Sequence, residues 1–370
     1  MPKARYIMIG GFLGAGKTTA ILKLAEHLTA QGLKVGLITN DQSVGLVDTA
    51  MLGAHGFDVQ EITGGCFCCR FNSLVDAANQ LSKQIRPDVF IAEPVGSCTD
   101  LKASVSYPLR RIYGDDFSVA PLSVLIDPVR ALRILGLEEG KAFSPKVVYV
   151  YRKQLEEAEI IVINKIDLLI TERLTALRNE LARQFPNSRI VEVSARKELG
   201  LVDWFDTIAV SDLGVGPSME VDYELYAEGE ALLGWLNCTV AISGPDLIDG
   251  NQFIRKIANH VQQSLKDALA EIAHLKLTFN PTEQGNDIAV LNQVRNDHPA
   301  EMSHELADPV REGELIINLR AETDPEMLNG FVSRAIAQVI ESYPGWAYEI
   351  VHEEHFRPGK PEPTHRFVEA

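Results

Sequence analysis

The sequence predicts an α/β fold with a mainly parallel sheet, followed by a smaller α+β domain. Its 370 residues exceed the usual size of one domain, so we expect two. In the first third, short β-branched runs alternate with helical stretches, as a parallel sheet with helical crossovers requires. After about Asp212 the chain becomes Gly- and Pro-rich without a clear period. We therefore expect a first domain at 1–212, a linker at 213–230, a second domain at 231–356 and a loosely ordered tail at 357–370.

Hydrophobic periodicity places the individual elements. The run YIMIG at 6–10 predicts a buried strand, the spacing over 18–31 a helix, and KVGLIT at 34–39 a second strand, which together form a β-α-β unit. Further strands are expected at 59–62, 89–92, 122–126, 159–163 and 189–193, with helices at 73–84, 128–135 and 171–184. The second domain is expected to have strands at 235–242, 273–279, 288–294, 314–319 and 348–352, with helices at 251–270 and 325–341 on one face of the sheet.

Composition and charge exclude several classes of protein. A hydrophobic content of 46% with 23% charged residues is typical of a globular chain. The net charge of −16 has the wrong sign for a partner that is a nucleic acid or an anionic membrane. No apolar stretch approaches the length of a membrane helix, and the start lacks the apolar segment of a signal peptide. We expect a cytoplasmic protein.

Residues 11–18, GFLGAGKT, match the phosphate-loop pattern G-x-x-x-x-G-K-[ST] between a predicted strand and a predicted helix. In such a loop the backbone N–H groups surround the phosphates, Lys17 reaches the β and γ oxygens, and the Thr18 hydroxyl can bind Mg²⁺. A Gly-rich turn that fits by chance is the alternative, and the flanking elements disfavour it. The candidate nucleotide-binding residues here are Gly11, Gly14, Ala15, Gly16, Lys17, Thr18 and Thr19.

The base is predicted from Asn164-Lys165-Ile166-Asp167, an N-K-x-D motif directly after a predicted strand. A carboxylate such as Asp167 only accepts hydrogen bonds, so it suits the N1–H and amino donors of guanine and not adenine. Lys165 could lay its aliphatic stem on the base, and Ser194-Ala195 could add a backbone N–H to the guanine carbonyl oxygen. An ordinary helix cap at Asp167 is the alternative. Together with the phosphate loop, the motif predicts GTP.

Hydrolysis needs a group near the γ-phosphate, and Glu93 ends a predicted core strand, where open α/β sheets place ligands. Glu93 could hold Mg²⁺ through water or orient the attacking water. Gly96 would let its N–H approach the γ-phosphate closely enough to respond to its loss. A solvated carboxylate at a strand end is the alternative for Glu93.

Three cysteines form the cluster Cys66, Cys68 and Cys69 in GGCFCC. Adjacent cysteines cannot crosslink distant loops, which argues against a disulfide framework. If the backbone turns after the two glycines, three thiolates converge on a soft metal such as Zn²⁺ and leave one ligand position open. Buried packing cysteines and a metal-free redox sensor are the alternatives. Cys98 and Cys238 are interpreted as packing residues, and His352 and His355 as surface residues rather than metal ligands.

In combination, GGFLGAGKTT at 10–19, ND at 40–41, GGCFCC at 64–69, E-x-x-G at 93–96 and NKID at 164–167 resemble the CobW-like metallochaperone GTPases, relatives of UreG, HypB and MeaB. The resemblance implies a P-loop GTPase domain whose C-x-C-C segment lies between two switch regions and binds Zn²⁺ or Co²⁺. It also implies slow hydrolysis of GTP that releases the metal to a client protein or a cofactor pathway.

Carried over to this chain, the resemblance assigns Lys17 and Thr18 to phosphate and Mg²⁺, Asn164 and Asp167 to guanine, and the three clustered cysteines to metal. Asp41 and Glu93 are candidate catalytic residues in the stretches expected to respond to the γ-phosphate. Three interpretations stay open: a metal-carrying GTPase, a GTPase that assists a cobalamin-dependent enzyme, and a redox-regulated nucleotide switch. The sequence names neither the client nor the metal.

Overall fold

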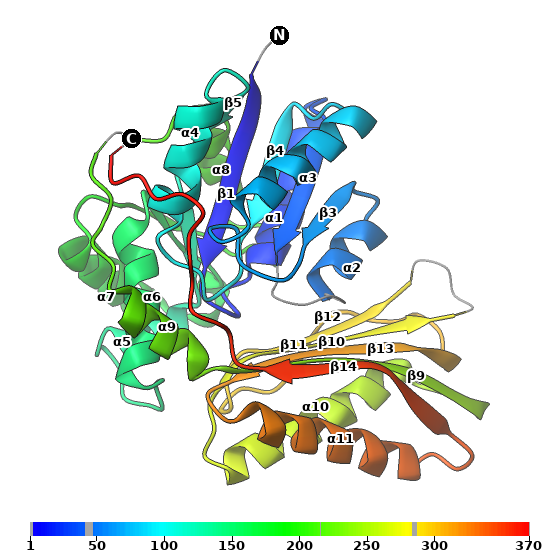
Figure 1. The fold of residues 1–370 in the computed structure, drawn as a ribbon. Helices are drawn as coiled ribbons and strands as arrows, with labels where there is room; N and C mark the ends of the chain where they lie inside the picture. The colour runs from blue at the N-terminus through cyan, green and yellow to red at the C-terminus, as the bar shows by residue number, and fades with distance from the viewer. Residues whose placement is uncertain (1–2, 41–46, 215, 283–286, 370) are drawn as a thin grey trace. The chain divides into compact units, whose positions relative to one another are not determined.

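The computed structural model describes residues 3–40, 47–214, 216–282 and 287–369. The chain forms two compact units, drawn from blue to red in chain order in Figure 1. The first contains residues 1–42, 56–229 and 360–370, and the second contains 43–55 and 230–359. No helix in the described residues combines the length and the apolar composition that a membrane crossing requires.

A parallel sheet forms the centre of the first unit, as the sequence predicts. Its strands run in the spatial order β3-β2-β4-β1-β6-β7-β8, and β5 pairs with β1 beside β6. Each of these pairings is parallel. The central strands are almost wholly buried, which explains their continuous apolar runs. The strands are β1 (Ala4–Gly11), β2 (Val35–Asn40), β3 (Val59–Ile62), β4 (Val89–Glu93), β5 (Phe117–Val119), β6 (Ser123–Ile126), β7 (Ile160–Ile163) and β8 (Arg189–Glu192).

Helices connect these strands, and several of them were not expected from the sequence. The predicted helices are observed as α1 (Lys17–Ala30), α3 (Phe71–Gln84), α5 (Pro128–Ile134) and α7 (Thr171–Gln184). The additional ones are the π-helical turn η1 (Lys102–Ser106), α4 (Tyr107–Tyr113), α6 (Pro145–Glu157), the short 3₁₀ turn η2 (Ile166–Leu168), α8 (Leu201–Val210) and α9 (Tyr223–Ala231). Helix α6 escaped prediction because its apolar stripe is interrupted by tyrosines and a buried glutamine.

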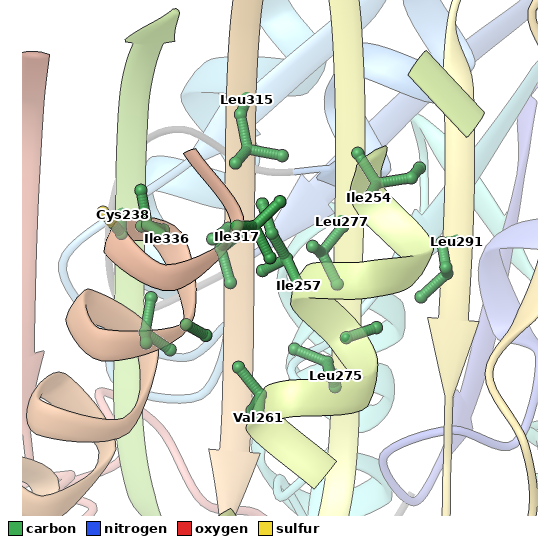
Figure 2. Packing of buried hydrophobic residues seen from close by; sticks show 14 of the residues in the cluster. Cys238, Ile254, Ile257, Val261, Leu275, Leu277, Leu291, Leu315, Ile317 and Ile336 are labelled. Carbon is green, nitrogen blue, oxygen red and sulfur yellow. The ribbon is translucent and has the colours of Figure 1, made fainter. Parts of the chain in front are cut away.

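The second unit is an antiparallel sheet covered by two helices on one face, in agreement with the predicted α+β domain. The strand order is β12-β11-β10-β13-β9-β14, and α10 and α11 pack against the sheet through the apolar cluster drawn in Figure 2. The strands are β9 (Gly234–Ile248), β10 (Ile272–Pro281), β11 (Ala289–Gln293), β12 (Glu301–His304), β13 (Val310–Ala321) and β14 (Ala347–Phe356), and the helices are α10 (Gly250–Asp267) and α11 (Pro325–Glu341). Strand β12 was not predicted.

The short helix α2 (Val47–Ala54) packs with the second unit, although it lies between β2 and β3 in the chain. Val47 forms an apolar cluster with Val290 and Ile316, and its N–H donates to Asn318 Oδ1 at 3.1 Å. On strand β13, Leu315 and Ile317 join the cluster under α10 and α11, so Ile316 between them faces the opposite side. Helix α2 therefore covers the face of this sheet that the other two helices leave open.

Two segments differ from the boundaries that the sequence predicts. Residues 213–229, expected as a linker, pack with the first unit, where the Leu213 N–H donates to Val119 O at 2.8 Å. The tail beyond Lys360, expected to be loosely ordered, also packs with the first unit and ends near α4 (Figure 1). The Phe367 N–H donates to Ala103 O at 2.9 Å, and the Phe367 ring lies 5.0 Å from the Arg111 guanidinium. A polar, Pro-rich composition does not reveal partners this far away in sequence.

Candidate nucleotide and metal sites

The phosphate loop lies between β1 and α1, where the sequence places it. The Lys17 ammonium donates to Gly11 O at 3.0 Å and lies 3.9 Å from Glu93 Oε1. At Gly16 the backbone has a positive φ of 90°, and a Cβ would meet Asn164 Nδ2 at 2.5 Å. Glycine is therefore required for two separate reasons, the left-handed backbone and the close approach of the N-K-x-D motif.

The predicted guanine motif contacts the phosphate loop directly. Asn164 donates from Nδ2 to Ala15 O at 2.9 Å, and Lys165 donates from Nζ to Gly14 O at 2.7 Å. Lys165 also forms an ion pair of 2.9 Å with Asp127, whose side chain is almost wholly buried. Asp167 is exposed on the 3₁₀ turn η2, so its carboxylate can meet a base.

The second part of the predicted base site has a different arrangement from the one expected. The Ala195 N–H, proposed for the guanine carbonyl oxygen, instead donates to Asn164 Oδ1 at 3.0 Å. Ser194 is fully buried, and its hydroxyl accepts from the Lys197 N–H at 3.2 Å. These two residues thus hold Asn164 and their own loop in place.

Glu93 ends strand β4 beside the phosphate loop. The Thr18 hydroxyl donates to Glu93 Oε1 at 3.1 Å, and both side chains are buried. Gly96 packs so closely on the loop that a Cβ would lie 3.0 Å from Leu13 N. The structure therefore brings Thr18, Glu93 and Gly96 together with Lys17 at one end of the loop. Asp41, the other candidate catalytic residue, lies outside the described residues.

Two residues of this region were missed by the sequence reasoning. Asp127 caps α5 by accepting from the Arg130 N–H at 3.0 Å, while Arg130 donates from Nη1 to Leu13 O at 2.6 Å. The Arg130 guanidinium also lies 5.3 Å from the Phe12 ring and 5.1 Å from the Phe143 ring. Asp127 is a carboxylate directly after a core strand. The same pattern identified Glu93, so it could also have identified Asp127.

The three clustered cysteines converge because the chain turns where they lie. Cys66 O accepts from the N–H groups of Cys69 and Arg70 at 3.0 and 2.9 Å, which forms one tight turn ahead of α3. Cys66 Sγ lies 2.6 Å from Cys68 Sγ and 3.3 Å from Cys69 Sγ, and Cys68 Sγ lies 3.6 Å from Cys69 Sγ. Among the described residues, these sulfurs form the one group of metal-ligating atoms within 4.8 Å of one another.

The thiols of this group differ in acidity. Hydrogen bonds from Cys68, then Cys69 and Cys98, hold the pKa of Cys66 well below its usual range. The same contact with Cys66 raises the pKa of Cys68 and of Cys69. Of the three, Cys66 is therefore the thiol that loses its proton most readily.

Side chains from two other parts of the first unit hold the cysteine loop. Asn40, at the end of β2, donates from Nδ2 to Ile62 O at 3.0 Å and to Gly65 O at 2.7 Å. The tail contributes Glu362, whose N–H donates to Cys69 Sγ at 3.2 Å, and Thr364, whose N–H donates to Cys68 O at 2.8 Å. The Thr364 hydroxyl donates to Cys69 O at 3.0 Å. The cysteine loop is thus fixed by strand β2 on one side and by the tail on the other.

The two histidines near the end of the second unit contact two different glutamates. His355 Nε2 lies 3.1 Å from Glu326 Oε1, and His352 Nε2 lies 3.9 Å from Glu354 Oε2. Neither belongs to the group of metal-ligating atoms found in the described residues.

Comparison with known proteins relates this arrangement to a family. The CobW/HypB/UreG nucleotide-binding domain matches residues 5–192, a little over half of the chain. The zinc chaperone YeiR of Escherichia coli (strain K12) is 33% identical over 172 residues, 46% of this chain and 49% of that protein. The zinc chaperone CobW of Sinorhizobium sp is 30% identical over 196 residues, 47% of this chain and 54% of that protein.

The chain thus spans about half the length of these curated relatives. Among solved structures, Zn(II)-bound YjiA GTPase from E. coli covers 92% of this chain and 99% of its own at 15% identity and a TM-score of 0.38. At a TM-score below 0.5, that likeness does not bear on function. Since the family match spans the larger part of the chain and contains the phosphate loop, the N-K-x-D motif and the cysteine loop, the chain belongs to the CobW/HypB/UreG family of nucleotide-binding proteins.

Proposed function

We propose that this protein binds and hydrolyses GTP and uses that cycle to hold and release a thiophilic metal ion, Zn²⁺ or Co²⁺, for a client protein. The observation that carries the proposal is that the phosphate loop, the N-K-x-D motif and the three-sulfur group lie in one unit. Metal carriage by the relatives named zinc chaperones supports it.

The nucleotide side of the proposal rests on donor and acceptor chemistry. Asp167 is an exposed acceptor that suits guanine, and Asn164 positions it by linking η2 to the phosphate loop. Mg²⁺ would be held by the Thr18 hydroxyl, with Glu93 beside it at 3.1 Å. When bound, Mg²⁺ would neutralise charge on the β and γ phosphates, and Lys17 would add its own positive charge.

The metal side rests on the fit of the sulfurs. Bonds of about 2.3 Å from Zn²⁺ to three sulfurs in a tetrahedral arrangement place the sulfurs about 3.8 Å apart. The observed separations of 2.6, 3.3 and 3.6 Å reach that geometry when they grow by about 1.2, 0.5 and 0.2 Å. Three protein ligands leave a fourth position open, which is the arrangement required of a carrier that must pass its ion on.

Asn40 connects the two sides. Its side chain donates to the cysteine loop at Ile62 O and Gly65 O, and it directly precedes Asp41, a residue expected to respond to the γ-phosphate. A shift of this segment on nucleotide exchange would move the cysteine loop with it. Because the coupling between two ligands is reciprocal, a metal that binds more tightly when GTP is bound must also raise the affinity of the protein for GTP.

The test is a measurement of metal affinity in two nucleotide states. We expect the protein to bind one Zn²⁺ or Co²⁺ at least fivefold more tightly with a non-hydrolysable GTP analogue and Mg²⁺ than with GDP, as competition with a chelating dye would report. Cys66→Ala should remove the metal, whereas Cys238→Ala, in the second unit, should not. Equal affinity in the two states would leave a static metal site and contradict nucleotide-driven delivery.

A redox-regulated switch is the second candidate, and the close approach of Cys66 and Cys68 favours it. Their sulfurs lie 2.6 Å apart as free thiols, so a peroxide could oxidise the pair to a disulfide with loss of two protons and two electrons. Elemental analysis of the purified protein separates the candidates, because a switch without metal contains none. A cobalamin-dependent enzyme as the client is a narrower form of the first proposal.

A further inference from the structure

Asp127 and Arg130 lie at the start of helix α5, and the function proposed above gives neither of them a role. Both side chains are buried, with residue exposures of 2% and 5%. The Asp127 carboxylate caps the helix by accepting from the Arg130 N–H at 3.0 Å. Buried charges are costly unless they are paired, and both side chains contact the nucleotide loops.

Three consecutive carbonyls of the phosphate loop accept hydrogen bonds from side chains. The bonds run from Arg130 Nη1 to Leu13 O at 2.6 Å, from Lys165 Nζ to Gly14 O at 2.7 Å and from Asn164 Nδ2 to Ala15 O at 2.9 Å. In a planar trans peptide, the carbonyl of one residue and the N–H of the next point in opposite directions. The donor on Leu13 O therefore turns the Gly14 N–H toward the opposite side of the loop, where phosphate oxygens would bind.

Two aromatic rings hold the Arg130 side chain in this position. Its guanidinium lies 5.3 Å from the centre of the Phe12 ring and 5.1 Å from that of Phe143. A guanidinium packed against two rings is a rigid donor, so the Leu13 carbonyl keeps its direction. Because negative charge shifts between phosphate oxygens during hydrolysis, an N–H that is aimed in advance stabilises the transition state without reorganisation.

Lys165 is held at both ends of its side chain. Its own N–H donates to Asn164 Oδ1 at 2.8 Å, and its backbone has a left-handed φ of 55°. At the other end, the ammonium donates to Gly14 O and pairs with Asp127 Oδ2 at 2.9 Å. The aliphatic stem between these ends has a fixed course, and the side chain is 25% exposed. It therefore offers a prepared apolar surface to a base.

We propose that Asp127 and Arg130 are positioning residues for GTP. Arg130 orients the phosphate loop through Leu13, and Asp127 fixes Lys165 as the surface on which the base lies. The inference rests on the proposed function and adds to it the two residues that prepare the site before the nucleotide binds. Both act through their partners, so Asp127 should affect recognition of the base and Arg130 the rate of hydrolysis.

The experiment on Asp127 compares GTP with inorganic tripolyphosphate, which has the phosphates without the base. Asparagine can keep the helix cap but lacks the negative charge that pairs with Lys165. We expect Asp127→Asn to bind GTP about tenfold more weakly and tripolyphosphate as tightly as the unmutated protein, as calorimetric titration with Mg²⁺ would report. In a Lys165→Met protein the same substitution should cause no further loss, because the ammonium is already absent.

The experiment on Arg130 measures steady-state hydrolysis of GTP. Methionine can pack between the two rings but cannot donate to Leu13 O, so Arg130→Met should lower kcat about tenfold and change KM less than about threefold. Arg130→Lys keeps a donor and should recover most of kcat. Arg110→Met is the matched control, because Arg110 on α4 also donates to a backbone carbonyl, Leu213 O at 3.0 Å, and lies 5.4 Å from the Tyr107 ring. It should hydrolyse GTP as the unmutated protein does.

The unmutated protein separates a failure of this inference from a failure of the proposed function. If it binds GTP no more tightly than tripolyphosphate, the proposed function itself is contradicted. If it selects GTP, equal weakening of both ligands by Asp127→Asn, or weakening of neither, would overturn the role of Asp127. An unchanged kcat in Arg130→Met, or an equal loss in Arg110→Met, would overturn the role of Arg130.

Discussion

The nucleotide loops and the cysteine loop lie in the same unit but are held in different ways. Lys17, Asn164 and Lys165 each donate to a carbonyl of the phosphate loop, and a buried carboxylate fixes Lys165. The cysteine loop instead depends on one asparagine and on a tail from the far end of the chain. The difference teaches that the phosphate loop is held by several charged and amide side chains, whereas the cysteine loop depends on fewer contacts, one of them from a residue 293 positions away.

Lys17→Ala removes one of the side chains that hold the phosphate loop, and it should have the largest effect of the substitutions considered. Loss of the ammonium removes the positive charge that meets the β and γ phosphates, so we expect GTP hydrolysis to fall by about 100-fold or more. Release of phosphate under saturating GTP measures the rate. Lys23→Ala, which removes the same charge six positions later on α1, is the matched control and should keep its activity. Unchanged turnover in Lys17→Ala would mean that the loop is not the site.

Asp167→Asn tests whether the exposed carboxylate selects the base. We expect the unmutated protein to bind GTP at least tenfold more tightly than ATP, a difference of about 1.4 kcal/mol. The asparagine amide can donate to an oxygen where the carboxylate cannot, so the preference should shift toward xanthosine triphosphate. Equilibrium binding of the three nucleotides is the measurement. Equal affinity of the unmutated protein for GTP and ATP would contradict the prediction that the protein selects guanine.

Glu157, a buried carboxyl at the end of α6, predicts a pH dependence of stability. It is buried and accepts from the Lys102 N–H at 3.0 Å and the Thr99 hydroxyl at 3.2 Å, just after Cys98. Burial raises its pKa from 4.5 to about 8. The folded protein thus keeps a proton that the unfolded chain loses, so the carboxyl stabilises the fold fully below pH 4.5 and progressively less up to about pH 8.

Glu157→Gln should therefore flatten the pH dependence of stability. Between pH 5 and 8, the free energy of unfolding of the unmutated protein should fall more steeply, by at most about 1.4 kcal/mol per pH unit. Urea midpoints across this range, with hydrogen exchange of the Lys102 amide as a local probe, provide the measurement. Glu156→Gln, an exposed neighbour on α6, is the control. Parallel curves for Glu157→Gln and the unmutated protein would show that this carboxyl ionises normally.

Thr364→Val tests how the tail holds the cysteine loop, and it should have the smallest effect. The hydroxyl donates to Cys69 O, so its loss should loosen the tail and make the thiols react roughly two- to threefold faster with a thiol reagent, as one neutral hydrogen bond permits. The metal-free protein with an absorbing disulfide reagent gives the rate. Thr171→Val, at an exposed position on α7, should react as the unmutated protein does. An unchanged rate in Thr364→Val would show that the tail does not limit access.

Local patterns explain what the sequence could predict. The phosphate loop, the N-K-x-D motif and the C-x-C-C cluster are short, and their flanking strands follow the apolar periods closely; α7 and α11 have the predicted bounds. The architecture of both units agrees with the predicted fold class. These features depend on neighbours within a few residues, and hydrophobic periodicity is a pattern over the same short range of sequence.

The features that could not be predicted depend on distant partners. Helix α2 has an apolar face whose partners, Val290 and Ile316, lie over 200 positions away. Composition marks the tail as loosely ordered, yet Arg366 forms a 2.7 Å ion pair with the buried Asp100. In each case the stabilising contact crosses between segments with no shared local pattern.

The contact between the tail and the cysteine loop also sets an order of events during synthesis. The hydrogen bond from Glu362 to Cys69 Sγ joins residues 293 positions apart. At about 5–20 residues per second, a ribosome makes Glu362 about 15–60 s after Cys69. During that interval the three thiols exist without the segment that later lies against them, so a metal ion bound as proposed would first meet an uncovered loop.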